Sequence, residues 1–280
     1  ETGYDGATTT AAAQVNSVDT SKIIIKPNVY SWRNINVGNM FKNSYDYQRE
    51  LDSHMMKNTE WGSVAYLQHS KYGSGASVRI NNNSAHITGY AGTEEPTLGY
   101  AGGTSTAGNR IESTALGVDA TYSVKYLNSK SLVASTTNNY SGIYDMSGGA
   151  WEYVMGYTTG ATTVGGSSGI TSLYPNFFSN SAYSKYWDRY TSTVNTNYNN
   201  RILGDATGEM GPFGSEKDSD NNTRYKSSWY KDHAWFANSS GNLLLRGGGW
   251  HDGTSTGVFA FNGNSGGTNT NISFRIVLAP

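Results

Sequence analysis

Two apolar segments near the C-terminus constrain the fold of this chain more than any other feature. Residues 243–250 have the sequence LLLRGGGW, and residues 272–278 have the sequence ISFRIVL. Each contains a short apolar run typical of a strand. The residues between them are mostly Gly, Asn, Ser and Thr, with a few aromatic residues. We therefore predict two strands that hold a polar segment between them, an arrangement that suits a binding surface better than a catalytic centre.

The composition predicts a folded chain with long polar loops. Apolar residues make up 36% of the 280 residues and charged residues 15%, below the averages of roughly 45–50% and about 25%. Disorder usually combines low hydrophobicity with high net charge and few aromatic residues. Here the net charge is -1, and the chain has 21 Tyr, 7 Trp and 8 Phe. We expect an ordered protein with an aromatic-rich, polar surface.

Several classes of function are disfavoured by the same composition. Lys and Arg form no cluster, which argues against a nucleic-acid partner. No apolar run approaches the roughly 20 residues that span a bilayer, so we expect no membrane insertion by this fragment. The absence of cysteine excludes disulfides, thiolate metal sites and thiol nucleophiles. A cysteine-free chain rich in Asn, Ser, Thr and Tyr is typical of a bacterial surface protein or a phage protein.

The patterned segments predict one domain over residues 21–280. Residues 1–20 are small and polar, and we interpret them as a linker or as the remnant of a stalk whose anchor has been removed. Ile23, Ile24 and Ile25 form a short apolar run that ends at Pro27 and predicts a strand. Residues 30–53 alternate aromatic and polar residues. Residues 142–157 predict a turn that leads into a short aromatic strand or a helical turn.

Residues 54–70 are the best helix candidate. Asn58 is expected to cap the helix, and Glu60 suits the positive end of the helix dipole. Trp61, Val64 and Ala65 follow at helical spacing.

Four segments resemble motifs of a known family. They are KNTEWGSVA at 57–65, GIYDMSGGAWEYV at 142–154, LRGGGW at 245–250 and SFRIV at 273–277. In this order they resemble the formylglycine-generating-enzyme-like branch of the C-type-lectin fold. The resemblance implies an α+β, C-type-lectin-like domain with long loop insertions. It implies no oxidase activity, because those enzymes use cysteines and this chain has none.

The tail is also similar to the variable proteins of diversity-generating retroelements, through GVF at 257–259 and NTNISFR at 269–275. Residues 24–34 and 52–61 resemble surface proteins of Gram-positive bacteria, which often carry a pilin-like N-terminal helix. That helix is not among these residues. The resemblance implies an extracellular, bacterial cell-surface adhesin or receptor-binding module, with pilus subunits as further partners through such a helix.

The predicted ligand-binding segment runs from residue 250 to residue 269. Tyr and Trp offer large contact areas, and Ser, Gly and Asn offer adaptable hydrogen bonds. The candidate contacts are Trp250, His251, Asp252, Thr254, Ser255, Thr256, Phe259, Phe261, Asn262, Asn264 and Asn269. Phe259 and Phe261 alternate with Val258 and Ala260, so one of the two pairs should face outward on a strand, and the aromatic pair would be a hot spot. Without the resemblance, an inert Gly/Asn loop would be the better interpretation.

We expect an extracellular protein as the partner, a glycan as the second choice, and no catalysis. A phage receptor-binding protein and a hydrolase with a carboxylate pair on the same fold are the alternatives. The five histidines are scattered and form no His-Glu-x-x-His motif. We interpret Glu152, Arg246 and Arg275 as scaffold residues that tie loops to the sheet.

No cofactor is expected, although calcium is an alternative at one place. Asp218, Asp220 and Asn222 offer alternating oxygen ligands. They lack the glycine and the distal glutamate of an EF-hand loop, so a solvated turn is the competing interpretation.

Overall fold

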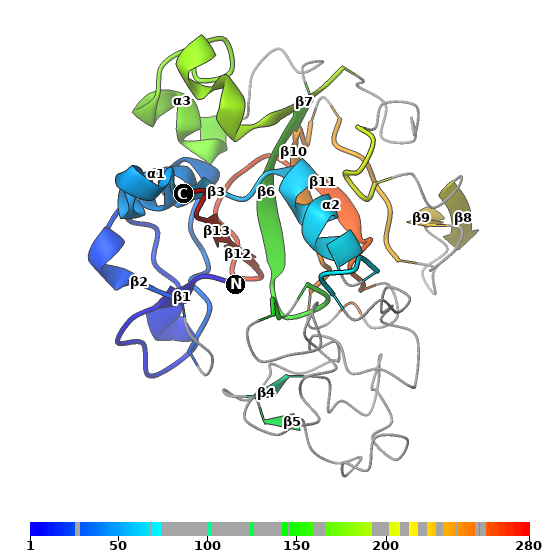
Figure 1. The fold of residues 1–280 in the computed structure, drawn as a ribbon, viewed down its shortest axis with the longest axis horizontal. Coiled ribbons are helices and arrows are strands. Elements are labelled where there is room, and N and C mark those ends of the chain that lie inside the picture. The colour runs from blue at the N-terminus through cyan, green and yellow to red at the C-terminus, as the bar shows by residue number, and fades with distance from the viewer. Residues whose placement is uncertain are drawn as a thin grey trace.

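A five-stranded sheet lies at the centre of the computed structural model (Figure 1). Its strands follow the order β11-β10-β6-β12, and β7 also pairs with β6. Their bounds are β6 (Trp151–Thr158), β7 (Asp188–Tyr190), β10 (Leu243–Arg246), β11 (Phe261–Asn264) and β12 (Ile272–Phe274). β10 is antiparallel to β6 and β11, whereas β7 and β12 are parallel to β6. The two predicted C-terminal strands are confirmed as β10 and β12, and both pair with β6. The segment predicted as a short aromatic strand or a helical turn is therefore a strand.

The structure describes residues 1–25, 29–67, 69–73, 100–101, 124–125, 142–144, 146–158, 166–191, 202–207, 213–217, 223–227, 232–238, 240–249, 252 and 256–280. The α-helices are α1 (Val37–Tyr47), α2 (Asn58–Leu67) and α3 (Ile170–Leu173). The 3-10 helices are η1 (Ala11–Ala13), η2 (Thr20–Lys22), η3 (Arg49–Leu51), η6 (Gly166–Ser168) and η7 (Ser181–Tyr186). Four two-stranded sheets pair β1 (Gly3–Tyr4) with β2 (Ile23–Ile24), β3 (His54–Met55) with β13 (Ile276–Val277), β4 (Tyr100–Ala101) with β5 (Val124–Lys125), and β8 (Phe213–Lys217) with β9 (Thr223–Ser227). This mixture of helices and strands confirms the α+β class.

The central strand β6 is covered on both faces. All eight of its residues are buried, as expected for a strand between two layers. Tyr153 and Met155 belong to the core cluster that contains Phe41 of α1. Val154, on the opposite face, belongs to the cluster that contains Trp61 of α2. The two helices therefore lie on opposite sides of the sheet (Figure 1).

Helix α1 was not predicted by the alternation of aromatic and polar residues over 30–53. Asn36 caps it, because the backbone N–H of Asn39 donates to Asn36 Oδ1 at 2.9 Å. Val37, Met40 and Phe41 are buried at helical spacing.

Helix α2 falls within the predicted range, but its first turn is capped differently from the prediction. The side chain of Asn58 donates from Nδ2 to the hydroxyl of Tyr190 at 2.7 Å and does not act as the cap. Glu60 instead accepts the backbone N–H of Lys57 at 2.8 Å, one half of a capping box. The side chain that was predicted to cap the helix therefore binds the buried Tyr190 instead.

The N-terminal residues pack on the sheet and do not extend from it as a linker. Thr2 N donates to Phe274 O at 2.8 Å, and Trp32 Nε1 donates to Val15 O at 2.7 Å. Gly3 pairs with Ile24 between β1 and β2. Among the described residues, no helix combines the length and the apolar character of a membrane span.

The glycines directly after β10 form a tight bend. Gly247 and Gly248 have φ values of 87° and 80°, a left-handed conformation that favours glycine. A Cβ at Gly248 would lie 2.7 Å from Thr256 Cα. The hydroxyl of Thr256 donates to Gly249 O at 3.1 Å, so this bend and the residues before β11 are in close contact.

Candidate functional site

The structure divides the predicted binding segment into a buried part and a part that reaches the surface. The buried predicted contacts are Thr256, Phe259 and Phe261. The contacts that keep some exposure are Asp252, Asn262, Asn264 and Asn269. The remaining predicted contacts, Trp250, His251, Thr254 and Ser255, lie outside the described residues.

The prediction that one of the two alternating pairs faces outward is wrong, because Val258 and Ala260 are only 5% and 0% exposed and the aromatic pair is buried as well. Phe259 and Phe261 are each 1% exposed and belong to the core beside α2. The backbone before β11 is tied to that helix, because Trp61 Nε1 donates to Val258 O at 2.8 Å. The strand begins only at Phe261, so the alternation of inward and outward residues does not apply to the turn before it. Thr256 is likewise buried by its contact with the glycine bend.

Asn262 and Asn264 form a polar row on β11. Asn262 lies opposite Leu245 and Asn264 opposite Leu243, and directly opposed residues share a face. Both asparagines therefore lie on the α1 side of the sheet, at one end of the strand order. Tyr153 fixes one of them, because its hydroxyl donates to Asn264 Oδ1 at 2.5 Å. Burial raises the pKa of Tyr153, so this hydroxyl keeps its proton.

Asp252 is held by two donors that meet at one carboxylate oxygen. Trp151 Nε1 donates to Asp252 Oδ2 at 2.6 Å, and the backbone N–H of Gly249 donates to the same atom at 2.8 Å. The ring of Trp151 also packs edge-on against His233, with 5.9 Å between centroids. Asp252 thus has a fixed position at the start of β6.

The charged residues that were interpreted as scaffold are confirmed in that role. Arg275 Nε donates to Glu152 Oε2 at 2.9 Å, and its Nη1 donates to Tyr144 O at 3.1 Å. Arg246 is fully buried and donates from Nη2 to Ala206 O at 3.0 Å. Both arginines connect the sheet to loops.

A buried carboxylate holds the loop at residues 202–207. Asp205 is fully buried and accepts hydrogen bonds from Ile202 N at 3.1 Å, Thr207 N at 2.8 Å and Tyr190 Oη at 2.8 Å. These donors satisfy a charge that would otherwise be costly in the core. We interpret Asp205 as a structural residue.

Asp232 is a second fully buried carboxyl group. Burial raises its pKa well above the ordinary value, although the N–H of Phe259 and the charge of Arg246 oppose the shift. Phe259 N donates to Asp232 Oδ2 at 3.1 Å. The group is closed to solvent, which favours a role in holding the turn before β11.

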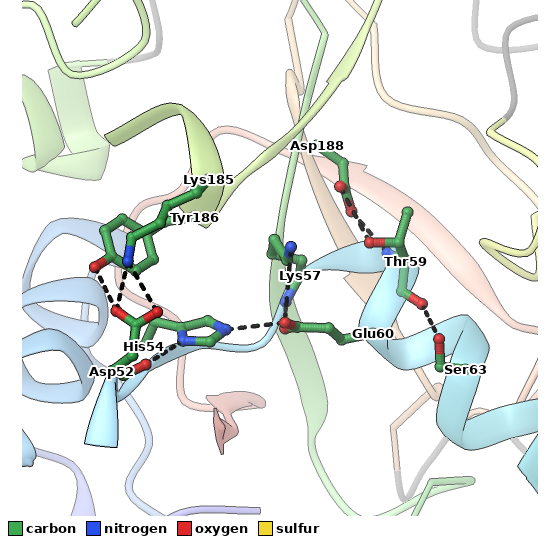
Figure 2. A network of polar contacts seen from close by, with 9 residues as sticks. All are labelled: Asp52, His54, Lys57, Thr59, Glu60, Ser63, Lys185, Tyr186 and Asp188. Carbon is green, nitrogen blue, oxygen red and sulfur yellow. Dashed lines mark hydrogen bonds and ion pairs between the residues drawn. The ribbon is translucent and has the colours of Figure 1, made fainter. Parts of the chain in front are cut away.

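A polar network joins β3, α2 and η7 (Figure 2). The ring of His54 contacts Glu60 Oε1 through Nε2 at 2.9 Å and the carbonyl oxygen of Asp52 through Nδ1 at 2.6 Å. The carboxylate of Asp52 accepts from Lys185 Nζ at 2.8 Å and from the hydroxyl of Tyr186 at 2.7 Å. The network therefore links the start of α2 to η7, which lies more than a hundred residues later in the sequence.

A second set of contacts caps α2 from β7. Asp188 Oδ2 accepts the backbone N–H of Thr59 at 2.7 Å, and its Oδ1 accepts the Thr59 hydroxyl at 3.1 Å. Burial raises the pKa of Asp188, and the bonds from Thr59 partly offset that effect. Ser63 donates to Thr59 O at 2.9 Å within the helix (Figure 2).

His54 is positioned for structure more than for catalysis. Both ring nitrogens are already engaged, so a proton transfer or a metal bond at either would first break a contact. Burial lowers the pKa of His54, but the contacts with Glu60 and Asp52 outweigh burial and leave that pKa raised. Of the other histidines, His69 is exposed and His233 is buried, as expected for surface and packing residues, and His86 and His251 lie outside the described residues.

Sequence reasoning missed most of these contacts, because their partners are far apart in the chain. Asp188 and Thr59 are separated by 129 positions, and Tyr186 and Asp52 by 134. The only local signal was Glu60 in the first turn of α2. No spacing rule connects residues at such distances.

Within the described ranges, no group of three or more His, Asp or Glu side chains is placed to hold a metal ion. The calcium candidates Asp218, Asp220 and Asn222 lie outside those ranges. Neither the family models nor the curated proteins that were compared with this chain contain a match.

Proposed function

We propose that this α+β chain is a C-type-lectin-like, non-catalytic binding module of the bacterial cell surface, and that its ligand is an extracellular protein. The four sequence motifs that carry the resemblance support this fold. Their segments form α2, β6, β10 and β12, and these elements pack on one another around a single sheet. β3 pairs with β13, and the backbone N–H of Thr2 donates to Phe274 O at 2.8 Å, so both segments join the C-terminal strands.

The observation that carries the proposal is the fixed polar row on β11. Asn262 and Asn264 are half-buried on the same face of the sheet. The hydrogen bond from Tyr153 sets the position of Asn264 in advance. Side chains that are already ordered lose less entropy when a partner binds. With Asp252 held by Trp151, these residues replace the buried phenylalanines as the proposed contacts.

A protein partner is favoured because the row offers half-buried amide groups on the last strand in the sheet order. Asparagine side chains donate and accept, and so can match the mixed polar surface of a protein. A glycan could form similar hydrogen bonds, so binding to glycans is tested separately. The proposal includes display on a pilus, which rests only on the resemblance to surface proteins of Gram-positive bacteria.

The test is a binding assay of the full chain against a panel of extracellular protein ectodomains and a glycan array. Replacement Asn262→Arg places a long charged side chain in the row and should weaken binding to the protein hit by about tenfold or more, as for a contact at the centre of an interface. Ser63→Arg is the matched control, because Ser63 is exposed on α2, on the other side of the sheet. Equal affinity of the two variants, binding only to glycans, or no binding at all would overturn the proposal.

A further inference from the structure

The sequence contains a single Asn-Gly pair, Asn262-Gly263, and the fold places it in β11. Glycine has no side chain to shield its backbone nitrogen, so this nitrogen can reach the side-chain amide carbon of the asparagine before it. We infer that Asn262 is a site of spontaneous deamidation through a succinimide. This inference does not depend on the identity of any ligand.

The structure already brings the two reacting groups together. The backbone N–H of Gly263 donates to Asn262 Oδ1, with 2.8 Å between nitrogen and oxygen. The hydrogen bond closes a small ring that contains the nitrogen and the amide carbon that it must attack. Asn262 is only half-buried, so water and hydroxide have access to the pair.

The reacting nitrogen lies on the outer side of β11. The N–H of Phe261 points away from β10, because it donates to His233 O at 2.9 Å. N–H groups two residues apart on a strand point in the same direction. The N–H of Gly263 therefore also points away from β10, and no bond to β10 has to break before this nitrogen reacts.

The reaction consumes only water. Hydroxide removes the amide proton of Gly263, the nitrogen forms a bond to Cγ of Asn262, and the side-chain nitrogen leaves as ammonia. Water then opens the five-membered imide. Cleavage at Cγ gives aspartate, and cleavage at the main-chain carbonyl gives isoaspartate. Either product adds a negative charge to the polar row, and isoaspartate also lengthens the backbone by one carbon and disturbs the register with β10.

Ring closure requires the backbone at Asn262 to leave the extended conformation for a short time. β11 is the last strand in the sheet order, and on its outer side an isolated bridge joins Phe261 to Ala234. Local opening at Asn262 therefore costs less free energy than in a strand that is paired along its whole length on both sides. We expect the folded protein to react more slowly than the unfolded chain, but within days at mildly alkaline pH.

Asn264, on the same strand and face, is the internal control. Its Oδ1 accepts from Tyr153 Oη at 2.5 Å and from Gly266 N at 3.3 Å, and the following residue is Ser265. The side chain is thus held away from the next backbone nitrogen, and that nitrogen is shielded by a side chain. Asn264 should react many times more slowly than Asn262.

The experiment incubates the folded full chain at mildly alkaline pH and at mildly acidic pH, with a parallel sample in urea. Trypsin then releases the peptide from Gly247 to Arg275, and fragmentation in a mass spectrometer locates the amide-to-acid mass change. Chromatography separates the aspartate and isoaspartate forms. The expected result is conversion at Asn262, faster at alkaline pH, with Asn264 intact.

Asn262→Gln is the matched variant, because its longer side chain would have to close a less favourable six-membered ring, and it should remove the acidic species. Intact Asn262 in the folded protein, over a time in which the urea sample converts completely, would overturn the inference. Conversion at Asn264 at the same rate as at Asn262 would also overturn it.

Discussion

Glu152 and Arg275 form an ion pair that ties β6 to the connection between β12 and β13. Their side chains are 1% and 12% exposed, and Arg275 also donates to the carbonyl oxygen of Tyr144. The pair therefore fixes three separate segments at one point. Both residues serve the scaffold.

Replacement of Glu152 by Gln should strongly destabilise the fold. It leaves the charge of Arg275 buried without its counter-ion, which typically costs about 3–5 kcal/mol. The free energy of unfolding in urea measures the effect. Arg49→Ala is the comparison, because Arg49 pairs with Asp46 at the surface with 60% of its side chain exposed, and such pairs contribute roughly 0–1 kcal/mol. Similar losses in the two variants would contradict the distinction between them.

Phe259→Ala should lower stability and should not act as a pure binding variant. Phe259 is 1% exposed, and a buried phenylalanine truncated to alanine typically costs about 3–5 kcal/mol. Tyr72→Ala removes an aromatic ring that is 74% exposed and should change stability by no more than about 0.5 kcal/mol. Thermal and urea unfolding of both variants check this. An unchanged melting temperature for Phe259→Ala would mean that Phe259 is an exposed residue and not part of the core.

The contact between His54 and Glu60 should make stability depend on pH. The pKa of His54 is raised above 6.5, so its contribution is fully present below pH 6.5 and disappears as pH rises through the folded-state pKa. Burial raises the pKa of Glu60, but His54 and the N–H of Lys57 outweigh burial and lower it below 4.5. The contribution of Glu60 is therefore present above pH 4.5 and disappears as pH falls.

The comparison of wild type with His54→Gln measures this dependence. The difference in free energy of unfolding should be largest between pH 4.5 and 6.5 and should shrink on the alkaline side. The charged neighbours Asp52, Lys57 and Lys185 remain in both proteins. A difference that stays constant from acid to alkaline pH would rule out the ionised pair as its source.

β2, β6, β10, β12 and α2 could be predicted because their apolar residues follow local patterns. α1 could not, since its buried face includes polar residues. Asn43 is fully buried and donates from Nδ2 to Ser17 O at 2.9 Å, and Ser44 donates to Met40 O at 2.8 Å. A hydrophobic pattern cannot reveal a buried helix face whose polar side chains are satisfied by hydrogen bonds.

The candidate surface could be placed in the sequence, but its orientation could not. Residues 256–261 are all buried, because Val258 and Phe259 form hydrogen bonds with α2 and Asp232 before β11 begins. The alternation of residue types predicted two opposite faces, but this rule applies only to residues within a strand.

Gly62→Ala should destabilise the protein although it lies inside a helix. In an exposed helix interior, replacing Gly by Ala is stabilising by about 1 kcal/mol. Here a Cβ would run into Gly204 O and would lie 2.8 Å from Cα of Asp205, in a loop held by the buried carboxylate of Asp205. Because that loop cannot move without breaking those bonds, we expect a net loss of about 1–3 kcal/mol. Ser63→Ala, one position later and exposed, should be neutral or slightly stabilising in the same urea titration. A stabilised Gly62→Ala variant would mean that the loop at 202–207 does not pack on α2 as closely as the structure places it.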